Sequence, residues 1–144
     1  MFRKAIFSLL TLQFLTAFFH SLSFFTSPVS ANETEKQLID LFTNYKQDLG
    51  MGFNRSMYDL FRGLSACFTL ICILGGWVNL YFLKNDLSAH LWKGLLKIEI
   101  IVFGALFLVM LFFTFLPPIV LTGLIFTAAI ASRYLVDTNQ AEAQ

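Results

Sequence analysis

The sequence has few charged residues, and this shortage excludes most kinds of soluble protein. Only 13% of its 144 residues are charged, whereas 57% are hydrophobic and 18 are phenylalanine. Soluble globular domains carry roughly 25% charged residues. The length suits one domain, but this composition cannot supply the surface of a soluble one. We therefore expect lipid to surround most of the chain.

The sequence also lacks the patterns of several kinds of binding and catalytic site. A net charge of +1 leaves no basic face for nucleic acid. Cys67 and Cys72 lie about 140° apart around a helix, so they are neither a redox pair nor a disulfide scaffold. His20 and His90 fall on opposite sides of the membrane in the topology below, so they cannot share a metal. With no phosphate loop and no nucleophile elbow, the sequence predicts no metal and no cofactor, and favours a non-catalytic protein.

Four apolar runs are long enough to cross a bilayer, because a spanning helix needs about 20 residues. They are Ala5–Phe25, Gly63–Leu83, Ile98–Leu116 and Ile119–Val136. The sequence predicts an all-α fold, an integral membrane four-helix bundle that forms a single domain, 1–144. Its helices are expected at about 4–27, 57–84, 95–116 and 118–136, with "LPPI" at Leu116–Ile119 making the last turn.

The first run has an alternative interpretation as a cleaved signal peptide. It has a basic start and a small-residue site at Val29-Ser30-Ala31, so cleavage would leave Asn32 as the first residue. However, its apolar stretch exceeds the roughly 7–15 residues of a signal peptide. It also carries polar residues at steps of three and four, which a leader does not need. We expect a retained helix.

The basic residues predict the orientation, because lysine and arginine favour the cytoplasmic side. They flank the first run, the connection between the second and third runs, and the end of the fourth: Arg3, Lys4, Lys84, Lys93, Lys97 and Arg133. Both termini are then cytoplasmic, in what we expect to be a bacterial cytoplasmic membrane. Residues 27–56 lie on the other side.

This outer segment contains an expected amphipathic helix at about 34–49. Apolar side chains recur within an arc of about 100° on a helical wheel, at Leu38, Leu41, Phe42, Tyr45 and Leu49. Thr34 and Gln37 fit a capping box, and Gly50 fits the helix end. We expect this helix to lie on the outer leaflet or to cover the bundle.

Two polar stripes predict how the first two spanning helices meet. The first helix carries Gln13, Thr16, His20, Ser23 and Ser27 within about 80°. The second helix carries small and polar residues at steps of four and three, namely Ser65, Thr69, Cys72, Gly76 and Asn79. Membrane helices approach closely and exchange hydrogen bonds along such stripes, so these two are expected to face each other.

Ionisable residues near hydrocarbon are costly and indicate candidate sites. Near the outer end we select a ligand-binding set of His20, Tyr58, Asp59, Arg62 and Ser65, and a catalytic set of His20, Arg55 and Asp59. A structural charge cluster with a satisfied histidine is the alternative. At the other end, counting from the proline turn places Glu99 and Arg133 at the same depth, which predicts a structural ion pair.

The segments "FHSLSFF" and "GFNRSMYDLFRGLS" together resemble an uncharacterised family of short four-span bacterial membrane proteins. The matching positions are His20, Ser21, Phe24, Gly52, Phe53, Arg55, Ser56, Tyr58, Asp59 and Gly63. The match covers the first two helices; Phe19 and Met57 depart from the family pattern, and Arg62 has no counterpart in it. The resemblance implies a four-span fold and a shared polar feature of His20, Arg55 and Asp59, but no activity.

Three functions remain open from the sequence. The leading hypothesis is a non-catalytic bundle that binds a membrane-protein partner or a small apolar ligand between the first two helices. The second is a membrane enzyme acting on a lipid-like substrate, with His20 as acid or base. The third is a structural subunit of a membrane complex.

Overall fold

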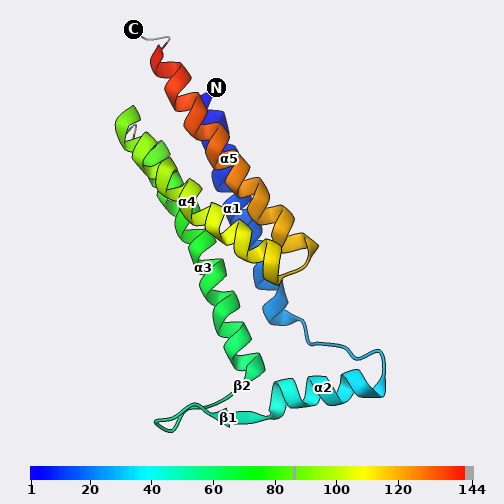
Figure 1. Ribbon diagram of the computed structural model, residues 1–144. Coiled ribbons are helices and arrows are strands. Elements are labelled where there is room, and N and C mark those ends of the chain that lie inside the picture. Colours follow the sequence, from blue (N-terminus) through cyan, green and yellow to red (C-terminus); the bar gives the residue numbers. More distant parts are fainter. Residues whose placement is uncertain (86, 142–144) are drawn as a thin grey trace. The chain divides into compact units, whose positions relative to one another are not determined.

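The computed structural model describes residues 1–85 and 87–141, and its long elements are all helices (Figure 1). The long helices are α1 (Phe2–Leu22), α3 (Met57–Lys84), α4 (Ala89–Phe113) and α5 (Leu116–Ala141). A short 3-10 turn, η1 (Ser23–Phe25), follows α1. All four are long and apolar enough to cross a membrane. The prediction of an all-α integral membrane helical bundle is confirmed.

The chain divides into two compact units, which we describe separately. Unit 1 comprises Met1–Ala17 and Ile71–Gln144, and unit 2 comprises Phe18–Leu70. Unit 1 therefore contains parts of all four long helices, while unit 2 contains the segment between α1 and α3 with the adjoining helix ends. The predicted single domain, 1–144, stays a prediction.

In unit 1, α4 and α5 form an antiparallel hairpin with close helix packing (Figure 1). A methyl group added at Gly104 would lie 2.9 Å from the Phe126 ring, and one at Gly123 would lie 3.1 Å from the Phe107 ring. Each glycine thus makes room for a phenylalanine of the other helix, and the two rings stack with centroids 6.2 Å apart. Small residues allow this approach between membrane helices.

The connection between α4 and α5 corrects one expectation. The chain turns at Thr114 and Phe115, and Leu116 already begins α5. Pro117 and Pro118 therefore lie in the first helical turn rather than in the loop. Proline suits that turn because the first N–H groups of a helix have no intrahelical partner.

The core of unit 1 is small, and much of its surface is apolar. Fully buried apolar side chains include Ile6, Leu9, Leu96 and Ile125. Large apolar side chains on the same helices point outward, and Phe113 is 83% exposed. Such a surface matches a hydrocarbon environment and not water. The start of α1 is fixed by the Phe2 ring against Trp92, 5.2 Å between centroids.

In unit 2, the amphipathic helix is shorter than predicted and begins earlier. α2 spans Glu33–Asn44. Asn32 caps it by accepting from the Glu35 N–H at 2.9 Å, and the Glu35 carboxylate accepts from the Ala31 N–H. The predicted capping box of Thr34 and Gln37 is therefore wrong by two residues. Asparagine is the better N-cap of the two, and its glutamate lies three residues on.

A small β-ribbon replaces the expected last turn of α2. β1 (Lys46–Asp48) pairs antiparallel with β2 (Asn54–Ser56), so the helix does not continue to Gly50. The turn between them has positive φ at Gly50, Met51 and Gly52. Glycine adopts this conformation without a steric penalty, which explains two glycines around an exposed methionine. The ribbon leads directly into α3 (Figure 1).

Candidate functional site

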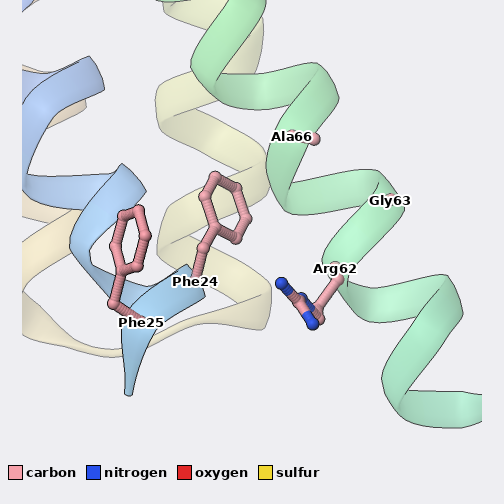
Figure 2. A pocket seen from close by; sticks show the side chains of 5 residues that line it. All are labelled: Phe24, Phe25, Arg62, Gly63 and Ala66. Atoms are coloured by element: carbon pink, nitrogen blue, oxygen red, sulfur yellow. The ribbon is translucent and has the colours of Figure 1, made fainter.

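A pocket of about 460 Å³ lies in unit 2, where η1 faces the first half of α3 (Figure 2). It is lined by Phe24, Phe25, Arg62, Gly63 and Ala66. Gly63 and Ala66 leave space on the α3 side, while the two phenylalanine rings form the opposite wall. Figure 2 shows the Arg62 guanidinium extending from α3 toward the side of Phe24. The pocket therefore combines an apolar wall with a fixed positive charge.

Tyr58 is the neighbour of Arg62 on α3, one turn earlier. The Arg62 guanidinium lies 5.6 Å from the centre of the Tyr58 ring, within the range of a cation–π interaction. Tyr58 in turn contacts Phe42 of α2, with ring centroids 6.0 Å apart. Two of the predicted ligand-binding residues, Tyr58 and Arg62, are thus next to each other. Ser65 is half-buried and is not among the residues that line the pocket.

His20 lies against aromatic rings. Its ring centroid is 4.8 Å from that of Phe68 and 6.5 Å from that of Phe24. Its Nε2 is buried and has no hydrogen-bond partner among the described residues. Phe24 also lines the pocket, so His20 contacts one residue of the pocket without lining it.

Ser56 and Asp59 form the capping box at the start of α3. The Asp59 carboxylate accepts from the Ser56 N–H at 3.0 Å, and the Ser56 hydroxyl accepts from the Asp59 N–H at 3.1 Å. This reciprocal pair satisfies two N–H groups that have no intrahelical partner. The Asp59 carboxylate therefore stabilises the start of α3.

The structure places Arg55 close enough to Asp59 for an electrostatic interaction, but it does not bring the third catalytic candidate, His20, to them. Arg55 donates to the Asn54 carbonyl at 3.2 Å and lies 5.9 Å from the Phe53 ring centre, within the ribbon. His20 packs on Phe68, which is nine residues after Asp59, or about 13 Å along the helix axis. The contacts seen for these residues are those of a helix start and an aromatic wall, and do not orient a general base.

A second polar group of residues lies inside unit 1, and we call it the polar cluster: Gln13 of α1, Asn79 of α3 and Glu99 of α4. The Asn79 side-chain N–H₂ donates to Gln13 Oε1 at 3.0 Å and to Glu99 Oε1 at 2.8 Å. Gln13 and Asn79 are fully buried, and Glu99 is 5% exposed. Asn79 therefore joins three helices through one amide group.

The polar cluster confirms the predicted contact between the two polar stripes at Gln13 and Asn79. Glu99 joins them as well, although residue counting predicts Arg133 as its partner. That ion pair stays a prediction, because the contact that the structure shows for Glu99 is with Asn79. Gly75 makes the approach feasible: a methyl group there would lie 2.6 Å from Gln13 Nε2.

Comparisons of this chain with protein-family models, with curated proteins and with solved structures found no match. The family resemblance of the first two helices therefore stays a prediction. No group of three or more histidine, cysteine, aspartate or glutamate side chains within residues 1–85 and 87–141 is arranged to hold a metal ion.

Proposed function

We propose that this chain is a small, non-catalytic membrane protein that binds an amphiphile with an anionic head group. The observation that carries the proposal is the pocket, in which the Arg62 guanidinium stands beside the aromatic side chains Phe24 and Phe25. A guanidinium binds phosphate or carboxylate oxygens through several N–H groups at once. The phenylalanine rings would cover the first part of an acyl chain.

Several features support an amphiphile over a wholly polar ligand. Phe25 is 85% exposed, so the pocket opens toward the surroundings of the helices. Its volume of about 460 Å³ lies within the usual range of about 300–1,000 Å³ for small-molecule sites. It suits a head group and part of a chain. The Arg62 guanidinium also lies 5.6 Å from the centre of the Tyr58 ring, within the range of a cation–π interaction.

The test is a binding titration with two lipids that have the same acyl chains, one with an anionic and one with a zwitterionic head group. Short-chain phosphatidylglycerol is expected to bind the detergent-solubilised protein more tightly than phosphatidylcholine of the same chains, as measured by calorimetry. Arg62→Gln is expected to weaken phosphatidylglycerol binding about tenfold, because a charge-assisted hydrogen bond contributes roughly 1.5–3 kcal/mol.

Arg55→Gln is the matched control, because Arg55 carries the same charge in unit 2 but does not line the pocket. Its side chain interacts with Asn54, Phe53 and Asp59 instead. This variant is expected to leave binding within twofold of the unchanged protein. Equal losses in both variants would mean that only net charge matters, and the pocket would then have no specific role.

We also propose that the protein resides in a bacterial cytoplasmic membrane with both termini in the cytoplasm. The distribution of lysine and arginine supports this orientation, and an even number of spanning helices returns the chain to its starting side. The segment with α2 and the β-ribbon then lies outside.

Reporter fusions test the orientation. A cytoplasm-active reporter at Gln144 is expected to be active, and one inserted at Tyr45 inactive, with an export-dependent reporter giving the opposite pattern. An export-dependent signal from Gln144 would reverse the topology. It would also place the pocket at the cytoplasmic side.

A further inference from the structure

Two oxygen atoms of the polar cluster are buried without a hydrogen-bond donor in the part of the chain that the structure describes. Asn79 donates to Glu99 Oε1, yet Asn79 Oδ1 and Glu99 Oε2 are buried and have no hydrogen-bond partner among the described residues. Both atoms are acceptors when Glu99 is a carboxylate, so neither can satisfy the other. An unpaired acceptor in a buried site costs roughly 1–3 kcal/mol.

One added proton would pair both oxygens. A protonated glutamate has an O–H donor on one oxygen and keeps an acceptor on the other. An amide side chain offers the complementary set, one N–H beside one C=O. We propose that Glu99 is a reversible proton-binding site within the helix bundle. Its Oε2–H donates to Asn79 Oδ1 and closes a two-bond ring with the existing N–H bond to Oε1.

The second N–H of Asn79 fits the same arrangement. Because a primary amide carries two hydrogens, one serves Glu99 Oε1 while the other serves Gln13 Oε1, and the structure shows both contacts. Once the proton is bound, the Asn79 side chain makes three hydrogen bonds. The step is simple: the carboxylate takes one proton from water, and the charge of the polar cluster changes from minus one to zero.

The groups around Glu99 define what competes with the proton. α1 presents Gln13 and α3 presents Asn79, which are both uncharged. The Gln13 Nε2 is also buried without a hydrogen-bond partner among the described residues, so it is a donor that competes with the proton for the carboxylate. α5 carries Arg133, which the sequence places at the same depth as Glu99. An ion pair with Arg133 would keep the carboxylate charged, so the proton site and the predicted ion pair are distinguishable by the protonation state of one residue.

Carboxyl-carbon NMR measures that state directly in the full-length protein. The chain has only four glutamates, Glu33, Glu35, Glu99 and Glu142, so selective isotope labelling of glutamate gives few signals. In lipid nanodiscs at pH 7 we expect one signal at the position of a protonated carboxyl group and the rest at the carboxylate position. Raising the pH is expected to convert that one signal to carboxylate.

Two variants assign the signal. Glu99→Gln is expected to remove it while keeping the fold, because a glutamine amide can reproduce both contacts with Asn79. Glu35→Gln is the control in α2 and is expected to leave it unchanged. If every glutamate in the unchanged protein is a carboxylate at pH 7, the proposal is overturned. An acid signal that survives in Glu99→Gln would overturn it as well.

Discussion

Gly75→Ala is expected to lower the stability of the helix bundle by about 1–3 kcal/mol, as overpacking of a filled interior usually does. The added methyl group would lie 2.6 Å from Gln13 Nε2 and 3.3 Å from the Phe103 ring. Gln13 cannot simply move aside, because its Oε1 accepts from Asn79 at 3.0 Å. The substitution therefore strains the packing and the hydrogen bond together. Thermal unfolding in detergent micelles measures the loss.

Gly94→Ala is the matched control for this prediction. A methyl group at Gly94 meets nothing within 4 Å, and alanine favours a helix over glycine by about 1 kcal/mol. We expect this variant to melt at the same temperature as the unchanged protein or higher. If Gly75→Ala were equally harmless, α1 and α3 would not approach each other as closely as described at this level.

Asn79→Ala is expected to have the larger effect, a loss of about 2–4 kcal/mol. Asn79 supplies the donor for Gln13 Oε1 and for Glu99 Oε1, so its removal leaves two buried acceptors without that donor. Each orphaned buried group costs roughly 1–3 kcal/mol. The effect is measured as the change in unfolding temperature and in folded yield from membranes.

Asn85→Ala controls for the loss of an asparagine at the end of the same helix. Asn85 is exposed, and its side chain donates to the Tyr81 carbonyl in the last turn of α3, so we expect a change of less than about 0.5 kcal/mol. Similar unfolding temperatures for the two alanine variants would show that the polar cluster does not hold the three helices together.

The spanning helices could be predicted from the sequence because each is a long apolar run. The second helix was predicted at 57–84 and is found at Met57–Lys84. The capping residue Ser56 before Met57 and the charged residue Lys84 mark the same helix ends as the apolar run between them. The sequence predicts the start of the fourth helix two residues late, because two adjacent prolines are typical of a turn. In fact Pro117 and Pro118 begin α5.

The β-ribbon could not be read from the sequence in the same way. Its strands have three residues each, too short for an alternating pattern, and Tyr45 and Leu49 also fit a helical face. The signal that would have revealed it is the pair Gly50 and Gly52 around one residue. Two glycines in three positions indicate a turn with positive φ.

The candidate site was predicted in part. The sequence indicates Arg62 near the end of the first helix, but it does not single out the other lining residues as pocket residues, because apolar and small residues are common along every spanning helix. Those residues are Phe24, Phe25, Gly63 and Ala66. For Glu99, counting residues gives depth and not the identity of the neighbouring helix. At one depth the helix has more than one neighbour, and Asn79 of α3 is the contact found.

The most direct test of the proposed function is native mass spectrometry of the full-length protein extracted gently from its membrane. We predict a bound species with the mass of an anionic amphiphile that is retained in the unchanged protein and in Arg55→Gln, and is largely lost in Arg62→Gln. Retention of the same species in Arg62→Gln, or a protein that carries only zwitterionic lipid, would contradict the assignment of the pocket as an anionic-amphiphile site.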